Sequence, residues 1–185
     1  MSPATAPRAP DRRAVLGLAA GALAVPGWSL AQTGSNSGPS WAPIGLSSLQ
    51  GRTLEAFVDT LIPATGSPGA KEAGVARFID KAVANWCPSA QAAAIRQALD
   101  RADSDARAAH GKAFGDLDAG QRRDIVAAME RDPKAAGAYL SLKDLTVTGY
   151  FTSEAGATVA LRYDPLPGAY RGCIPLSEIG RAWAT

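Results

Sequence analysis

The 185-residue sequence has few of the residues from which catalytic and metal sites are usually built. It contains two cysteines and one histidine, which is too few for a Cys/His metal site, and it has neither a C-x-x-C nor a C-x-x-C-H motif. The histidine, His110, stands at an expected helix end, where this side chain commonly interacts with the helix dipole. No nucleophile or orienting carboxylate is near it in sequence. We therefore predict no catalytic residue and no metal ligand in this chain.

Aromatic residues and excess charge are also scarce. Aromatic residues form 6% of the sequence and are dispersed, so a stacking platform for nucleic acid is not expected. The formal net charge is +2, and residues 1–31 account for all of it, which leaves the rest without a basic surface. Residues 65–69 contain glycines but fit neither G-x-x-x-x-G-K-[ST] nor G-x-G-x-x-G. We therefore predict no cofactor-binding residue in the chain and no nucleic-acid partner.

The sequence also lacks an apolar run long enough to span a membrane. Its N-terminal apolar run, residues 14–25, is about 12 residues long, whereas a spanning helix needs about 20. This run follows Arg12 and Arg13 and precedes a small-residue site that ends at Ala31. The three parts are typical of a secretory signal, and the paired arginines indicate the twin-arginine type, which carries folded proteins. We predict that residues 1–31 are this signal and that the mature protein is periplasmic, with an uncleaved membrane anchor as the alternative.

The remaining residues, about 154, are enough for one domain. Residues 32–46 are rich in Ser, Gly and Pro and predict a flexible linker, in which Trp41 is an exception that could contact a surface. Residues 47–185 predict an all-α domain, a small bundle of about five helices. The first three expected helices are Leu54–Ile62, after a cap at Ser47 or Ser48, then Val75–Trp86 and Ser89–Ala109. A fourth helix follows the Asp118/Gln121 capping box. The fifth has Asp132 as N-cap and Pro133 as first residue, directs Tyr139 and Leu140 inward and ends near 147–151.

The helical pattern decays from about residue 156. Residues 158–163 fit either a short strand or a last helical turn, and residues 164–175 hold three prolines and two glycines, which excludes regular structure. We predict an irregular Pro/Gly-rich C-terminal arm. Two thiols in an oxidising compartment most often pair, so we expect a Cys87–Cys173 disulfide that ties this arm to the end of the second helix.

Three stretches of the sequence resemble a known family. Residues 57–70 (FVDTLIPATGSPGA), with Gly74-Val75 and Phe78-Ile79-Asp80 after them, resemble the opening of the gluconate 2-dehydrogenase subunit 3 family. Residues 142–146 (LKDLT) and 149–154 (GYFTSE) resemble that family's second block, and residues 167–173 fit its usual ending. The resemblance spans about residues 50–175, although residues 88–133 resemble nothing in particular.

The resemblance implies a small subunit that is not an enzyme by itself. In such complexes the catalytic subunit is an FAD-containing flavoprotein of the glucose–methanol–choline (GMC) type that oxidises sugars or sugar acids, and a cytochrome c with haem c commonly accepts the electrons. The chain would stabilise the flavoprotein, support its folded export, and meet the membrane only through the complex. A stand-alone periplasmic ligand-binding or interaction module is the alternative.

The motif residues have two possible roles, maintenance of the fold and docking of a partner. If they dock a partner, the docking surface consists of the loop after the first helix, the 149–154 segment and the arm. Its residues are Pro63, Ser67, Pro68, Gly69, Tyr150, Phe151 and Tyr170. Asp59 and Asp80 are expected to cap or pair across the first two helices. The acidic residues at 100, 103 and 105 predict a solvated helix face with i,i+4 ion pairs.

Overall fold

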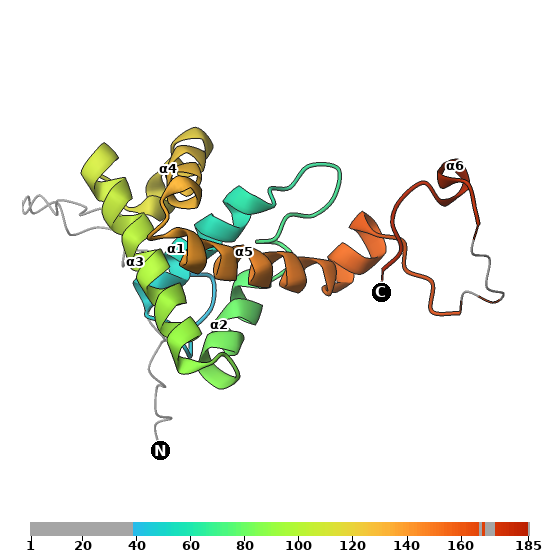
Figure 1. The fold of residues 1–185 in the computed structure, drawn as a ribbon, viewed down its shortest axis with the longest axis horizontal. Coiled ribbons are helices and arrows are strands. Elements are labelled where there is room, and N and C mark those ends of the chain that lie inside the picture. The colour runs from blue at the N-terminus through green and yellow to red at the C-terminus, as the bar shows by residue number, and fades with distance from the viewer. Residues whose placement is uncertain (1–38, 167, 169–172, 185) are drawn as a thin grey trace, which may run out of the picture. The chain divides into compact units, whose positions relative to one another are not determined.

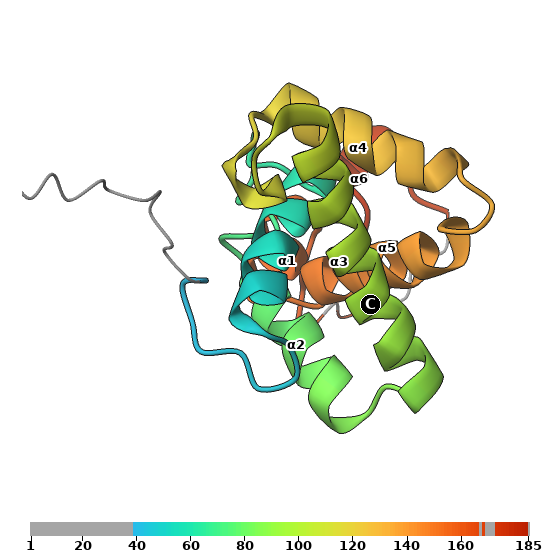
Figure 2. The same ribbon diagram turned by 90° about the vertical axis from the view of Figure 1, so that its left-hand side faces the viewer.

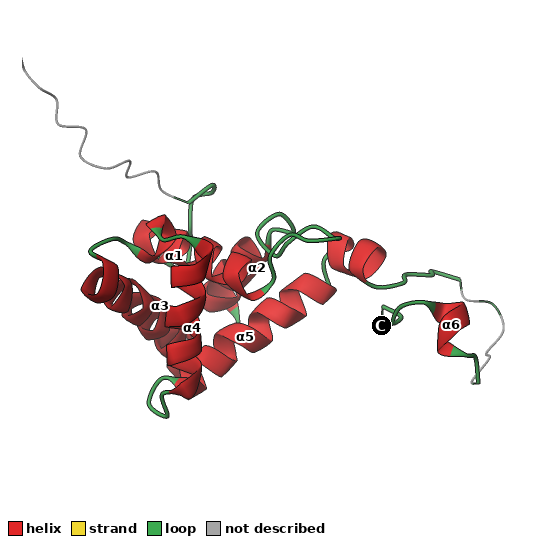
Figure 3. Cartoon of the chain, turned by 90° about the horizontal axis from the view of Figure 1, so that it is seen from above, coloured by secondary structure: helices red, strands yellow, loops and turns green. Residues whose placement is uncertain are grey.

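The computed structural model describes residues 39–166, 168 and 173–184 (Figure 1). The predicted signal residues Arg12, Arg13 and Ala31 and the predicted docking residue Tyr170 lie outside this range. The described residues form helices and no strand (Figure 3), so the predicted all-α fold is confirmed. The elements are α1 (Ser48–Leu61), α2 (Val75–Asn85), α3 (Ser89–His110), the 3₁₀ turn η1 (Phe114–Asp116), α4 (Ala119–Arg131), α5 (Ala136–Phe151), the π-helical turn η2 (Gly156–Ala160) and α6 (Leu176–Ile179).

Five helices, α1 to α5, pack around one apolar core (Figures 1 and 2). The α5 helix contacts the other four helices, and α1 also contacts α2, α3 and α4. The rings of Phe114 and Tyr139 lie 6.3 Å and 6.4 Å from the ring of Phe57. The core therefore joins helices that are distant in sequence, and it fixes the ends of α1, α2 and α5 relative to one another.

Two helix starts follow the predicted capping signals. At α1, the Ser47 hydroxyl accepts from the Gln50 backbone N–H at 3.2 Å, and the Gln50 side chain accepts from the Ser47 N–H. At α4, Asp118 and Gln121 make the same reciprocal pair. Each capping box satisfies two N–H groups that the helix itself leaves without a partner.

The start and inward face of α5 differ from the prediction. Asp132 ends α4 as its C-cap, and its carboxylate accepts from the Lys134 N–H in a turn, so α5 begins at Ala136. Leu140, predicted to be inward, is 50% exposed, whereas Leu142 and Thr146 are fully buried. The buried stripe of α5 runs through Tyr139, Leu142, Thr146 and Tyr150, which leaves Leu140 beside it on the exposed side. Trp86 was also predicted to be inward and is 57% exposed, because α2 ends at Asn85 before Trp86 can join its buried stripe.

The two aspartates beside the family motifs have separate partners. The Asp80 carboxylate, 1% exposed, accepts backbone N–H groups of Ile44, Gly45 and Leu46 at 2.8 to 3.0 Å. Asp59 pairs with Arg122 of α4 at 3.3 Å. Asp80 thus ties the segment before α1 to α2, and Leu46 in that segment is buried in the core.

The acidic face predicted for α3 is only partly solvated. Arg101 and Asp105 make the expected exposed i,i+4 pair at 3.1 Å. Asp103 is 6% exposed and accepts the Phe114 N–H at 3.0 Å and Arg107 Nε at 2.7 Å. The prediction is therefore wrong for Asp103, because the η1 turn folds back over it.

The C-terminal arm folds onto its own beginning. Arg162 and Trp183 form a parallel bridge, and the Arg162 guanidinium lies 4.3 Å from the centre of the Trp183 ring. The Arg181 side chain also donates to the Val159 carbonyl. The first residues of the predicted arm form the π-helical turn η2, so residues 158–160 take the second of the two expected forms, a last helical turn, and Arg162 makes only an isolated bridge. The described residues between 164 and 175 form no regular element, as predicted.

The structure does not contain the predicted disulfide. Cys87 is a half-buried free thiol just after α2, and Cys173 is an exposed free thiol in the arm. The hydrogen bonds of residues 181–184 join the arm to residues 159–162 instead of to α2, so nothing described brings Cys173 to Cys87. Within the described range, no helix has the length and apolar character needed to cross a membrane.

Candidate docking surface

The loop between α1 and α2, residues 62–74, has a fixed backbone. The Ala70 N–H donates to the Ile62 carbonyl at 2.9 Å, and the Thr65 N–H donates to the Ser67 carbonyl at 3.2 Å. A Cβ at Gly69 would stand 2.7 Å from the Ala64 nitrogen, so this close turn needs a glycine. The bond from Ala70 to Ile62 holds these two residues together, and residues 63–66 between them are exposed to solvent.

Tyr150 of α5 ties this loop to the helix bundle. Its ring is 2% exposed, and its hydroxyl donates to the Pro68 carbonyl at 2.8 Å and lies 3.0 Å from the Ser67 hydroxyl. The two motif blocks, which are separated by about 80 residues, thus meet through one phenol group. A buried tyrosine hydroxyl normally finds such a partner, and here the partner sets the position of the loop.

Close packing of α2 against α5 brings these parts together. A Cβ at Gly149 would lie 2.6 Å from Phe78 Cδ1 and 3.2 Å from Val75 Cγ1. Glycine at 149 therefore lets the Phe78 ring lie against the α5 backbone, and the Phe78 ring in turn packs edge-on against Trp86 at 5.6 Å.

The chain turns sharply after α5. The Ser153 hydroxyl donates to the Tyr150 carbonyl at 2.6 Å and accepts from the Gly156 N–H at 3.1 Å. A Cβ at Gly156 would collide with the Tyr150 carbonyl. Phe151, which packs edge-on against Tyr150 at 5.1 Å, remains 39% exposed beside this turn.

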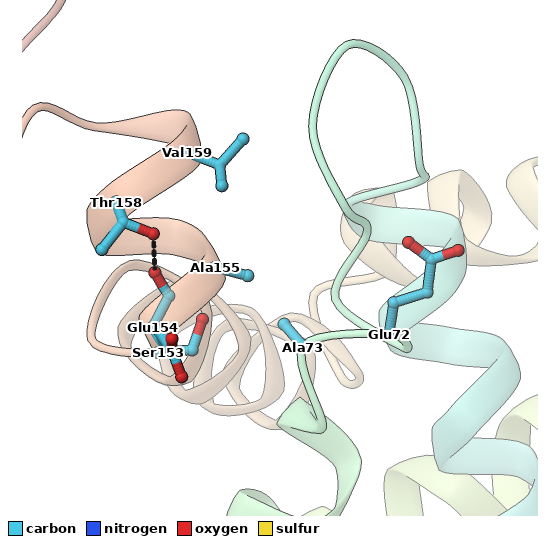
Figure 4. Close-up of a pocket in the computed structure, with 7 residues that line it drawn as sticks. All are labelled: Glu72, Ala73, Ser153, Glu154, Ala155, Thr158 and Val159. Carbon is cyan, nitrogen blue, oxygen red and sulfur yellow. Dashed lines mark hydrogen bonds between the residues drawn. The ribbon is translucent and has the colours of Figure 1, made fainter.

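A groove of about 340 Å³ lies between the end of the loop and the segment after α5 (Figure 4). Its lining residues are Glu72, Ala73, Ser153, Glu154, Ala155, Thr158 and Val159. Figure 4 shows the methyl groups of Ala73 and Ala155 directed toward each other across it, with Val159 farther along the same side as Ala155. Apart from the two residues of the GYFTSE block, Ser153 and Glu154, sequence reasoning missed this lining, because alanine and valine side chains carry no pattern that marks a site.

The structure therefore unites part of the predicted docking set. Ser67, Pro68, Gly69 and Tyr150 are in one hydrogen-bonded assembly, and Phe151 lies beside it. Ser67 and Pro68 are half-buried, and Gly69 and Tyr150 are buried, so these four hold the surface in shape from beneath. Pro63 is exposed at the start of the loop.

The two groups whose pKa values are raised by burial lie away from this surface. Burial raises the pKa of the Cys87 thiol, and burial likewise raises the pKa of Tyr139, but both groups belong to other parts of the bundle. No group of three or more His, Cys, Asp or Glu side chains among the described residues is arranged to hold a metal ion. Shape, apolar area and the carboxylates of Glu72 and Glu154 are what this surface offers.

A comparison with protein families matches residues 48–168 to the family described as gluconate 2-dehydrogenase subunit 3. The matched segment covers about two thirds of the chain and runs from α1 through η2 into the arm. It includes the loop, Tyr150 and every residue that lines the groove. No curated protein and no solved structure matches the chain.

Proposed function

Because the chain belongs to the gluconate 2-dehydrogenase subunit 3 family, we propose that it is the non-catalytic small subunit of a periplasmic, FAD-dependent dehydrogenase. The catalytic subunit is a GMC-type flavoprotein that oxidises a CH–OH group of a sugar or sugar acid. It carries the FAD, and a cytochrome c subunit with haem c accepts the electrons. The family match over residues 48–168 is the observation that carries this proposal.

We propose that the flavoprotein binds at the surface formed by loop 62–74 and the 149–159 segment. Loop 62–74 and the 149–159 segment come together through the Tyr150 hydrogen bonds to Pro68 and Ser67. A surface that is already ordered loses little conformational entropy when a partner binds. We infer that the flavoprotein docks here, with exposed Pro63 and Phe151 in contact with it.

Export gives the small subunit a second role in this account. FAD is loaded in the cytoplasm, so the flavoprotein must cross the membrane folded. The twin-arginine signal predicted for residues 1–31 of this chain would serve both subunits. The complex would then act in the periplasm, and its contact with the membrane would be indirect.

Replacement of both signal arginines tests this role. The full chain carrying Arg12→Lys and Arg13→Lys is expressed together with its native flavoprotein, and dehydrogenase activity is measured in periplasmic and cytoplasmic fractions. We expect the activity to move from the periplasm to the cytoplasm. Normal periplasmic activity with this variant would contradict the export role.

The groove supports one other candidate, a stand-alone binding module. Its volume of about 340 Å³ lies at the lower end of the range for small-molecule sites, roughly 300 to 1,000 Å³. That candidate predicts a chain isolated without a flavoprotein and a ligand in the groove.

A further inference from the structure

The groove beside the loop has an electrostatic character that points to its occupant. Of the seven residues that line it, Glu72 and Glu154 carry negative charge and none carries positive charge. Building on the proposed function, we propose that this groove receives a lysine or arginine side chain of the flavoprotein subunit. Glu154 lies in the 149–154 segment of the docking surface predicted from the sequence, but neither glutamate is among the individual residues named for it, and the contact with a basic side chain is additional to that prediction.

The apolar part of the groove suits the stem of such a side chain. Ala73 contributes one side, and Ala155 and Val159 contribute the other (Figure 4). Val159 is 42% exposed, which is a substantial apolar area left open to water. Lysine and arginine bury their methylene groups against surfaces of this kind and keep the charged end at the rim. The two alanines leave room for the stem where larger side chains would fill the space.

The hydroxyl groups of the groove are already engaged within the chain. The Thr158 hydroxyl donates to the Glu154 carbonyl at 2.7 Å. The Ser153 hydroxyl donates to the Tyr150 carbonyl and accepts from the Gly156 N–H. Since both hydroxyl protons are used within the chain, the lining offers carboxylate acceptors and no free side-chain donor, a set that best suits an occupant that only donates, such as an ammonium or guanidinium group. The carboxylates remain as the groups that give the groove its specificity.

Both carboxylates can meet a cation. Glu72 Oε2 accepts the Gly69 N–H at 3.2 Å, which holds this side chain in place beside the loop, and Glu154 is exposed at the other wall. Two basic residues adjoin the lining, Lys71 as the chain neighbour of Glu72 and Arg181 through its contact with Val159. Lys71 is exposed and does not line the groove, and Arg181 donates to the Val159 carbonyl. A basic side chain from a partner would therefore complement charges that the lining itself leaves unbalanced.

Charge reversal in the intact complex tests the proposal. The tagged full chain is expressed with its native flavoprotein as wild type, Glu72→Lys, Glu154→Lys and the double variant, and the complex is washed on an affinity column at rising NaCl concentration. Asp124→Lys is the matched control, because Asp124 is an exposed carboxylate on α4 that does not line the groove. The measurement is the fraction of flavoprotein retained at each salt concentration.

We expect each reversal to lower the salt concentration that releases the flavoprotein, and the double variant to retain about tenfold less than wild type. The Asp124→Lys complex should behave as wild type. Glu72→Gln and Glu154→Gln remove the charge without adding bulk, and they should give smaller shifts in the same direction even if a lysine variant folds poorly.

Retention of the flavoprotein by the double variant at the wild-type salt concentration would overturn the inference and leave the proposed function intact. The same result would be expected if the groove held a small cationic ligand or a second copy of this chain. If the wild-type chain retains no flavoprotein at all, the proposed function itself fails, so the two failures are distinguishable.

Discussion

At the scale of single residues, the Asp80 carboxylate supports the segment that leads into α1. Its Oδ1 accepts from Gly45 and Leu46, and its Oδ2 accepts from Ile44. The Asp80 side chain that accepts all three hydrogen bonds is almost completely buried. Hydrogen bonds to a charged group are stronger than neutral ones, and a buried donor without a partner is costly.

The isosteric change Asp80→Asn should therefore destabilise the fold by about 2 to 4 kcal/mol, because an amide NH₂ would face at least one of these N–H donors. Chemical denaturation of the variant and the wild type measures this difference. Asp124→Asn, at an exposed position of α4, should change stability by less than about 0.5 kcal/mol. Equal stability of the two variants would contradict the role assigned to Asp80.

The Tyr150 hydroxyl is the second residue-scale test. Tyr150→Phe removes the hydrogen bond to Pro68 and the contact with Ser67 while the ring stays in place. We expect a loss of about 1 to 2 kcal/mol in the free energy of unfolding and faster amide exchange in loop 62–74. Tyr163, 58% exposed, supplies the control, and Tyr163→Phe should leave both quantities unchanged. Unchanged loop exchange in Tyr150→Phe would show that the loop is held by other contacts.

We predict that the two cysteines differ in their rate of alkylation. Burial raises the pKa of the Cys87 thiol, so at a given pH less of it is the reactive thiolate, and its alkylation rate should continue to rise at pH values above its ordinary pKa of about 8.5. Cys173 is exposed and should be alkylated faster at pH 8. Peptide mass spectrometry after timed iodoacetamide treatment measures both rates. If neither thiol reacts before a reductant is added, the cysteines form the disulfide that the structure lacks.

Residue roles were the hardest part to predict from the sequence. Periodicity identified Leu54 and Phe57 as core residues, because a helical stripe is a local pattern. It placed Asp103 on a solvated face and Leu140 in the core, and the structure reverses both. Asp103 is buried by the η1 turn, a contact between residues 11 positions apart that side-chain periodicity does not encode.

At the scale of elements, the approach of α2 to α5 depends on Gly149. Gly149→Ala would place a methyl group 2.6 Å from Phe78 Cδ1, which would force the two helices apart. We expect a destabilisation of about 1 to 3 kcal/mol, the usual range for overpacking in a core. Thermal or chemical unfolding of the variant measures it.

The same helix supplies the control. At Gly137 a Cβ would meet nothing within 4 Å, so Gly137→Ala should be neutral or should stabilise α5 by up to about 1 kcal/mol through higher helix propensity. The two substitutions are chemically identical, so opposite signs would isolate the contact with Phe78. Similar effects at both sites would mean that the α2–α5 contact tolerates a methyl group.

The elements themselves were largely predictable. The expected cap at Ser47 and the expected Asp118/Gln121 capping box each lie within four residues of sequence, and both formed. The predicted start of α5 was wrong because the Asp132-Pro133 sequence fits both a helix start and a turn. The structure uses it as a turn, with Asp132 still serving α4 as its C-cap. Local signals therefore predicted helices well and the junction between two successive helices less well.

At the scale of the whole molecule, we propose that the chain is a support whose docking surface is already ordered before a partner binds. The family resemblance singled out the segments around 63–70 and 149–154, and the structure joins them through Tyr150. The groove next to them could not be predicted, because its walls come from two segments that meet only in the folded chain. The described residues form no metal-ligating cluster, and in our account the redox chemistry belongs to the partner.

The most direct test of this account is the composition of the complex purified from the periplasm of the native host through a tag on this chain. Mass spectrometry should identify a GMC-type flavoprotein in a constant molar ratio to the chain, and the eluate should show the absorbance of FAD together with sugar or sugar-acid dehydrogenase activity. Recovery of the chain alone, without flavin and without a flavoprotein, would contradict the account.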